Sequence, residues 1–163
     1  MSLIKSQKEI ETLREGGKRL ASILKALKKE IKVGVTGKQM DKMAREMIEK
    51  LGDTPSFLNY RPSGAKFPFP AALCFSVNNQ VVHGIPTDRP LADGDIVTID
   101  LGLIHKGLYT DSALTLAVGK VDGKIERLMS STKGALNVAI KATRHGKRIG
   151  DIGYAVENFV GEE

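Results

Sequence analysis

Two aspartates eleven positions apart, Asp100 and Asp111, are the residues of this sequence best placed to do chemistry together. They lie in the stretch 96–111, where apolar and polar residues alternate on both sides of a turn signal, which predicts a β-hairpin. If the turn is centred between His105 and Lys106, the two aspartates face each other. Like charges opposed in this way, with Cβ atoms roughly 4.5–5.5 Å apart, destabilise a sheet. A bridging cation, a shared proton or hydration on an open sheet face must then offset their repulsion.

The same register divides the hairpin into two faces. One face carries apolar pairs suited to a protein core, and the other carries the aspartates with room beside their carboxylates. The core face holds Val97/Leu114 and Leu103/Leu108, and the open face holds Thr98/Ala113, Asp100/Asp111 and Gly102/Tyr109. We therefore expect the aspartates to lie on the open face of a sheet.

Two helices and a loop are predicted before this hairpin. Apolar residues recur at three- and four-residue steps over 4–31 and again over 40–51, which indicates two amphipathic helices. A glycine-containing break separates them, and Thr36 or Gly37 can cap the second helix. Four prolines exclude a continuous helix over 53–70, so this stretch is predicted to be a loop.

The loop and its surroundings concentrate aromatic side chains. Five of the eight Phe and Tyr residues lie in it or just after it: Phe57, Tyr60, Phe67, Phe69 and Phe75. They could wall an apolar pocket or cover an exposed sheet edge. Strands are predicted over 71–77 and 80–83, which places His83 where a strand ends at a glycine. A functional role for His83 requires that it face the carboxylates.

The helical pattern returns after residue 120 and repeats the organisation of the first helices. A shift of 112 positions aligns helix, glycine break and helix in the same order. Six residues of the first copy, Leu13, Leu24, Gly34, Met40, Met47 and Ile48, fall on Ile125, Leu136, Gly146, Ile152, Phe159 and Val160. Strands follow the first copy but not the second, so we expect a sheet with an open edge.

Length and composition bound the class of protein. The 163 residues suffice for one domain with a sizeable core, and no long apolar run or signal peptide suggests a membrane. The single cysteine, Cys74, excludes an internal disulfide and a structural zinc site of cysteines, which fits the cytoplasm. The net charge of +6 lies mainly on helical stretches. Such charge usually marks a solvated face, although it could favour docking on a polyanion such as ribosomal RNA.

The motifs together resemble the first half of a type I methionine aminopeptidase. The resemblance rests on the segment Val82–Pro86 with the sequence VHGIP, on 93–97 with the sequence DGDIV, and on the two spaced aspartates. The opening stretch from Ile4 to Gly16 is similar too, and the likeness extends to residue 160. The HGIP segment distinguishes the chain from the proline-specific relatives and from the type II enzymes.

The resemblance implies a pitabread fold, in which two pseudo-symmetric α/β halves surround an antiparallel sheet with two metal ions at its centre. It implies that Asp100 and Asp111 are metal ligands, with Asp111 bridging both ions, and that His83 contacts the substrate near the scissile peptide. Phe69 and Cys74 fall where the family lines the pocket for the methionine side chain, and thioether–aromatic contacts suit that role. The ions would be cobalt, manganese, iron or zinc, and the substrates would be the N-terminal methionine peptides of nascent proteins.

The remaining ligands of this family, a histidine and two glutamates, belong to strands of the second half. The chain is therefore expected to be one domain incomplete at its C-terminus, with a complete first half over 1–120 and only the second half's helix pair over 121–163. Two aspartates and one histidine do not make a dinuclear site. We expect the isolated chain to bind metal weakly and to hydrolyse little, and one aspartate to have a raised pKa.

Several readings remain open at this point. The chain could be a shortened methionine aminopeptidase or one completed by another polypeptide. It could also be a non-catalytic pitabread remnant that binds nascent chains or docks on the ribosome through its basic helices. A simple calcium or magnesium module built on the aspartate pair is a third reading, but it leaves the HGIP segment unexplained. The open sheet edge could also drive self-association.

Overall fold

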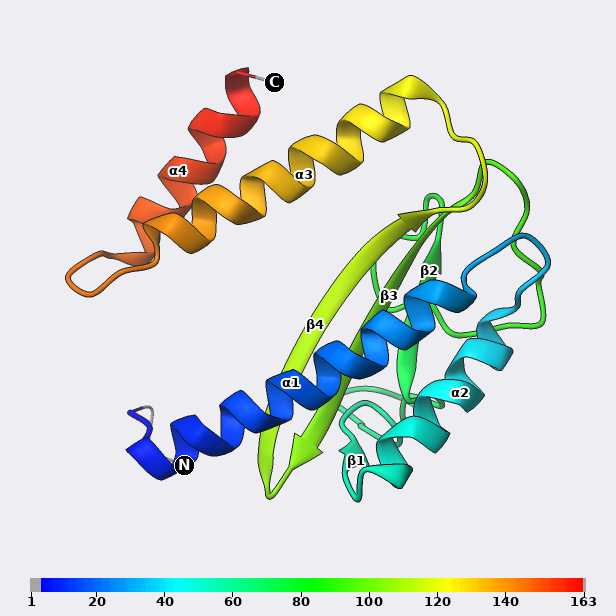
Figure 1. Ribbon diagram of the computed structural model, residues 1–163, viewed down its shortest axis with the longest axis horizontal. Helices are drawn as coiled ribbons and strands as arrows, with labels where there is room; N and C mark the ends of the chain where they lie inside the picture. The colour runs from blue at the N-terminus through cyan, green and yellow to red at the C-terminus, as the bar shows by residue number, and fades with distance from the viewer. Residues whose placement is uncertain (1–3, 163) are drawn as a thin grey trace. The chain divides into compact units, whose positions relative to one another are not determined.

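The computed structural model describes residues 4–162. The chain forms two compact units, which divide between Lys120 and Val121 (Figure 1). The first contains two helices and an antiparallel sheet, and the second contains a helix pair. No helix within residues 4–162 is both long enough and apolar enough to cross a membrane.

The helices of the first unit begin where the sequence provides caps. Helix α1 (Gln7–Glu30) starts after Ser6, whose backbone N–H is bound by the Glu9 carboxylate at 2.7 Å in a capping box. Helix α2 (Gly37–Lys50) starts after Thr36, which forms a second capping box with Gln39. The predicted cap at Thr36 is thus confirmed. The first helix starts three residues later than predicted, because Ser6 satisfies its free N–H groups.

The sheet is built around β3 (Ile96–His105). Strand β4 (Leu108–Ala117) pairs with one edge of β3, while β2 (Leu73–Val77) and the short β1 (Thr54–Pro55) pair with the other edge, all antiparallel (Figure 1). Strands β1 and β2, which a loop separates in the sequence, therefore lie along the same edge of β3.

The hairpin between β3 and β4 confirms the predicted faces but not the predicted register. His105 pairs with Leu108, and the turn consists of Lys106 and Gly107, both with positive φ (48° and 81°). A two-residue turn of this kind matches the twist of the flanking strands. It moves the turn by one position and the register by two residues, so the expected direct opposition of the two aspartates is wrong. A shift of two leaves each side chain on its predicted face.

The predicted strand over 80–83 does not form. Asn78 has a positive φ of 55°, and the Gln80 side chain accepts the backbone N–H of Val77 at 3.0 Å. These contacts turn the chain away from β2. It returns only at Gly84, whose carbonyl accepts the N–H of Phe75 at 2.7 Å and whose N–H donates to Ser76 Oγ.

The core lies between the two helices and one face of the sheet. Side chains of α1, α2, β2 and β3 bury together, among them Ile23, Leu27, Met40, Ile48, Leu73, Ile99, Leu101 and Leu103. The alternate residues of β3 and β4 point to the opposite face, where no helix of this unit packs (Figure 1). The sequence pattern therefore leaves one face of the sheet open for a ligand.

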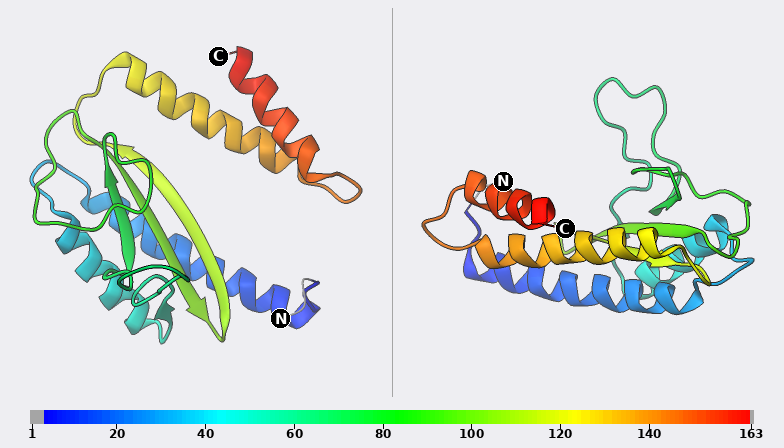
Figure 2. Two further views of the ribbon diagram at one scale, coloured as in Figure 1. Left: turned by 180° about the vertical axis from the view of Figure 1, so that it is seen from behind. Right: turned by 90° about the horizontal axis from the view of Figure 1, so that it is seen from above.

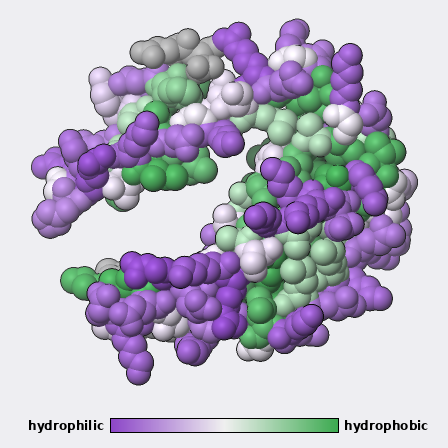
Figure 3. Space-filling view, viewed as in Figure 1, coloured by the Kyte–Doolittle hydropathy of each residue, from purple (hydrophilic) through white to green (hydrophobic). Residues whose placement is uncertain are grey.

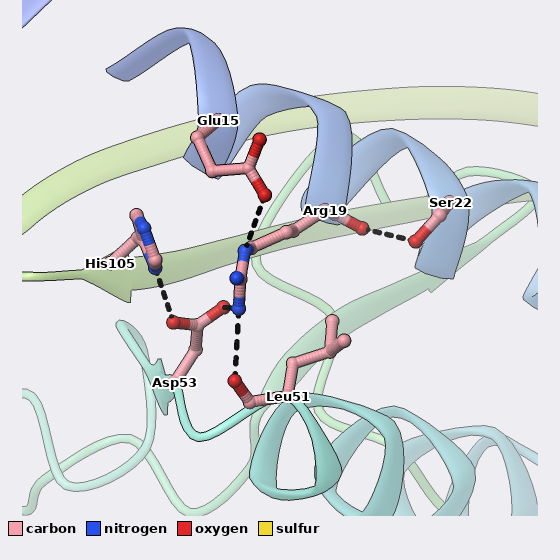
Figure 4. A network of polar contacts seen from close by, with 6 residues as sticks. All are labelled: Glu15, Arg19, Ser22, Leu51, Asp53 and His105. Atoms are coloured by element: carbon pink, nitrogen blue, oxygen red, sulfur yellow. Dashed lines mark hydrogen bonds and ion pairs between the residues drawn. The ribbon is translucent and has the colours of Figure 1, made fainter. Parts of the chain in front are cut away.

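A buried polar cluster joins the hairpin tip to α1 (Figure 4). Nδ1 of His105 lies 2.7 Å from Oδ1 of Asp53, and both side chains are almost fully buried. Arg19 donates to the other oxygen of Asp53, to the Leu51 carbonyl at 2.9 Å and to Glu15 at 3.0 Å. His105 thus holds the fold together on the core face, away from the two aspartates of the open face.

The helix pair of the second unit repeats the bounds of the first. Shifted by 112 positions, the end of α1 and the start of α2 fall on the end of α3 (Gly123–Ala142) and the start of α4 (Ile149–Glu162). The glycines of the two breaks, Gly34 and Gly146, share a positive φ of 88° and 81°. Leu128, Leu136 and Ile140 of this unit are exposed. Figure 3 shows hydrophobic surface on the helix pair. The predicted repeat of helix, glycine break and helix is confirmed.

Candidate metal centre

Asp100 and Asp111 are diagonal neighbours on the open face of the sheet. Asp100 on β3 pairs with Ala113, and Asp111 on β4 pairs with Gly102. Directly opposed residues share a face, and diagonal neighbours have Cα atoms roughly 7–8 Å apart, within reach of a shared ligand. The aspartates therefore come together as predicted, although across the diagonal.

The proximity of the two carboxylates changes their proton affinity. Burial, then the negative charge of Asp111 and a hydrogen bond between the two carboxyl groups, together raise the pKa of Asp100 to about 6. The charge of His83 acts against this rise. The expected raised pKa on one of the pair is confirmed, and a proton can replace a cation between the carboxylates at mildly acidic pH.

Cys74 lies beside the aspartates. It is directly opposite Asp100 in the pairing of β2 with β3, so its side chain shares the open face, where it is 5% exposed. Burial, together with the charges of Asp100 and Asp111, raises the pKa of the thiol to about 12. Near neutral pH the cysteine is an uncharged, weakly polar group next to two acids.

His83 stands at the outer edge of β2. It is exposed, has a positive φ of 57°, and directly precedes Gly84, which is hydrogen-bonded to β2 on both its N–H and its carbonyl. A Cβ on Gly84 would lie 2.4 Å from the Phe75 carbonyl oxygen, so the backbone can approach β2 this closely only at a glycine. The resulting position lets the imidazole act electrostatically on Asp100.

Phe69 belongs to an ordered loop between β1 and β2 that projects from the sheet (Figure 2). Its N–H donates to the Tyr60 carbonyl at 2.8 Å, and its carbonyl accepts the N–H of Asn59 at 2.9 Å. Its ring meets Phe57 edge to face, with centroids 6.5 Å apart and an interplanar angle of 88°. Of this pair, Phe57 lies against Gly102 on the open face of the sheet.

Two neighbouring loop residues also reach this face: Phe57, one of the five aromatics named from the sequence, and Ser56, which the sequence reasoning missed. Ser56 and Phe57 lie over Gly102, where a Cβ would come within 2.1 Å of Ser56 Oγ and 3.1 Å of Phe57 Cε1. The one available signal was the glycine itself, because glycine within a strand often marks close approach of another segment.

The donors gathered here are few but suited to divalent cations. Within residues 4–162, no three His, Cys, Asp or Glu side chains form a metal-binding cluster. The paired carboxylates supply hard oxygen donors, and their mutual repulsion is relieved by a positive charge. The arrangement fits one side of a metal centre.

Comparison with known proteins identifies the family. The sequence profile of metallopeptidase family M24 matches residues 11–163. The methionine aminopeptidase of Aquifex aeolicus is 40% identical over 152 residues, and that of Clostridium perfringens is 38% identical over 160 residues. These alignments cover 93% and 98% of this chain but 59% and 62% of the relatives, so the chain spans about 60% of their length.

Solved structures give the same result at the level of the fold. The methionine aminopeptidase of Rickettsia prowazekii superposes with a TM-score of 0.92 at 34% identity, over 99% of this chain and 63% of that one. A Xaa-Pro dipeptidase of Bacillus anthracis superposes with a TM-score of 0.83 at 20% identity, a likeness of fold alone. The pitabread fold implied by the sequence resemblance is confirmed, and the chain belongs to metallopeptidase family M24.

Proposed function

We propose that this chain carries one wall of a metal-dependent methionine aminopeptidase, which removes the N-terminal methionine from nascent proteins. The observation that carries the proposal is the meeting of Asp100 and Asp111 on one open sheet face, with Cys74 directly beside them. Relatives at 38–40% identity are methionine aminopeptidases, and the family's metallopeptidases depend on divalent metal.

The two aspartates would hold the ions. Divalent cobalt, manganese, iron or zinc bound there would supply Lewis-acid chemistry for peptide hydrolysis. Asp100 must lose its proton before it can coordinate, and its raised pKa of about 6 means that it does so only above mildly acidic pH. We therefore expect the aspartate pair to bind divalent cations near pH 7 and to release them when the pH falls below about 6.

The other named residues would position the substrate. His83 is exposed and acts on Asp100 through its charge, so it can reach a peptide held at the carboxylates. Cys74, as a neutral thiol, and Phe69, as part of an aromatic pair, would contact the methionine side chain, since sulfur and aromatic edges both suit a thioether.

Manganese titration followed by NMR tests the proposal. Mn²⁺ broadens amide signals near its binding site, and we expect broadening centred on residues 100 and 111 with a Kd on the order of 10⁻⁴–10⁻³ M, as for weakly built oxygen sites. The Asp100→Asn and Asp111→Asn variants should lose it. Asp88→Asn is the matched control, because Asp88 is an exposed carboxylate of the same unit that pairs with Lys38. Equal broadening in Asp111→Asn, or none in the wild type, would show the proposal to be wrong.

A peptide assay completes the test. With added Co²⁺ or Mn²⁺, the isolated chain is expected to release little methionine from a Met-Ala-Ser peptide, since it supplies two carboxylates to the centre. Turnover at ordinary enzyme rates would mean that other described residues complete the centre, contrary to this assignment.

A further inference from the structure

The loop between β1 and β2 rises from the open face of the sheet. Figure 2 shows it on the side of the sheet opposite to α1, and the base of the loop meets the sheet where Phe57 lies against Gly102. The aspartate pair is on this face as well. A peptide held at Asp100 and Asp111 therefore leaves the sheet on the side from which the loop projects.

Hydrogen bonds within the loop order its tip. The Phe69 N–H donates to the Tyr60 carbonyl at 2.8 Å, which joins the two arms of the loop. Beyond this contact, the Ala65 N–H donates to the Pro62 carbonyl at 3.1 Å, and Nε of Arg61 donates to the Ala65 carbonyl at 3.0 Å. A tip that is held by its own hydrogen bonds loses little conformational entropy when it binds a ligand.

The tip carries positive charge without a neighbouring acid. No Asp or Glu occurs over 54–87, whereas Arg61 and Lys66 both lie at the tip. Among residues 4–162, neither of these cations forms an ion pair with a carboxylate. Arg61 uses its Nε within the loop, which leaves its terminal guanidinium nitrogens for an outside acceptor. The tip is therefore electrostatically complementary to a negatively charged ligand.

Exposed aromatic rings accompany these cations. Nζ of Lys66 lies 5.4 Å from the centroid of the Phe67 ring, a cation–π arrangement. The Phe67 side chain is 72% exposed and that of Tyr60 is 60% exposed. A ring beside a cation suits an extended acidic peptide, because the apolar atoms of the peptide can pack on the ring while its carboxylates meet the cation. An inorganic anion would use the charge alone.

We propose that Arg61 and Lys66, together with the ring of Phe67, bind acidic side chains of the substrate peptide beyond its first residues. This inference rests on the proposed function, because a peptide held at the aspartates presents a fixed position to the tip. Lys66 is three residues from Phe69 in the sequence, which is roughly 10 Å of extended chain. A substrate that rises beside the loop covers this height in about three residues, so its fourth and fifth residues meet the cations.

Two peptides of the same shape and different charge test this role. The peptide amides Met-Ala-Ser-Asp-Glu and Met-Ala-Ser-Asn-Gln are titrated into the Zn²⁺-loaded chain and followed by NMR shift changes. In about 0.1 M salt the wild type should bind the acidic peptide about fivefold more tightly, the order that two exposed ion pairs give, with shifts at residues 60–68. In about 1 M salt the preference should disappear, because the screening length falls to about 3 Å.

Charge variants of the tip complete the design. The double variant Arg61→Gln/Lys66→Gln should bind the two peptides equally. Lys66→Gln alone should reduce the preference to about twofold, and it leaves in place the hydrogen bonds that order the tip. Lys66→Arg should keep the preference, because it keeps the charge. Lys25→Gln is the matched control, since Lys25 is an exposed lysine of α1, on the opposite side of the sheet, and it should keep the wild-type ratio.

The outcomes separate this inference from the proposed function. If Zn²⁺ binds at the aspartates but the wild type binds both peptides equally, or the double variant keeps the preference, the role of the tip is refuted and the metal centre stands. If Zn²⁺ does not bind at the aspartates, the proposed function fails and this inference fails with it.

A nucleic-acid ligand is the other class of partner that exposed rings and cations suit. A single-stranded oligouridine that shifts residues 60–68 at lower concentration than the acidic peptide would overturn the inference and assign the tip to nucleic acid. Far-UV circular dichroism and the dispersion of the amide spectrum verify that each variant is folded.

Discussion

Replacing Asp111 with asparagine should stabilise the metal-free chain near neutral pH. The substitution keeps the shape of the side chain but removes one of two negative charges that share an open sheet face. Asp100 then ionises without a like charge beside it. A gain in stability from the loss of a proposed metal ligand is the expected signature of a pair arranged for a cation rather than for folding.

The magnitude follows from the pKa of Asp100. It rises from an ordinary 3.8 to about 6, and one unit corresponds to 1.36 kcal/mol, so ionising Asp100 in the folded chain costs at most about 3 kcal/mol. Burial, the largest cause, persists in the variant, and solvent screens the part due to Asp111. We therefore expect a gain of about 1 kcal/mol.

The sign of the pH dependence provides an internal check. A carboxyl whose pKa is higher in the folded state binds a proton more tightly there than in the unfolded state. Stability therefore falls as pH rises from about 4 to about 6 and stays low above that range. The gain from Asp111→Asn should be present at pH 7.5 and absent at pH 4.

Urea unfolding at both pH values, followed by far-UV circular dichroism, measures this gain. Asp88→Asn serves as the control for removing one carboxylate, and it should change the free energy of unfolding by less than about 0.5 kcal/mol at either pH. Added Mn²⁺ should stabilise the wild type and not Asp111→Asn. A variant less stable than the wild type at pH 7.5, or a gain that persists at pH 4, would refute the reasoning.

Three further substitutions test the scaffold around the site by urea unfolding. Thr110→Val should stabilise the chain by about 1 kcal/mol, because the buried Thr110 hydroxyl has no hydrogen-bond partner; a loss of stability would contradict this. Gly84→Ala should cost about 1–3 kcal/mol, because its Cβ would lie 2.4 Å from the Phe75 carbonyl oxygen; an unchanged midpoint would exclude this close approach. Asp53→Ala should cost about 3 kcal/mol by leaving the buried His105 unpaired, and a cost below about 1 kcal/mol would count against the buried cluster.

The architecture follows from local sequence signals to a large extent. Period-3.6 stripes and capping residues define the helices, and strict alternation defines the hairpin and its two faces. The register of the β3–β4 hairpin was harder to predict from the sequence, because it depends on which residues adopt a positive φ at the turn. Lys106 has a positive φ although it is not a glycine, and its side chain gives no sequence signal for this conformation. Similarly, the apolar run after Asn78 predicted a second strand over 80–83, but the positive φ of Asn78 turns the chain away from β2 and this strand does not form.

The positions of the site residues could be predicted from the sequence where those residues lie on regular strands, and less well where they lie on loops. Asp100, Asp111 and Cys74 share a face because strand pairing repeats every two residues, so a register error of two preserved their proximity. Phe57 reaches the same face through a loop that crosses the sheet at Gly102. That crossing depends on contacts between residues distant in sequence, which no local pattern encodes.

The position of Cys74 has a consequence for the chemical reactivity of the chain. Alkylating agents and oxidants attack the thiolate, and burial with two neighbouring carboxylates keeps this thiol protonated. The same charges that attract a cation thus protect the cysteine while no cation is bound. When those charges are neutralised, the protection weakens. The rate at which iodoacetamide modifies this single cysteine therefore reports on the charge carried by the aspartate pair.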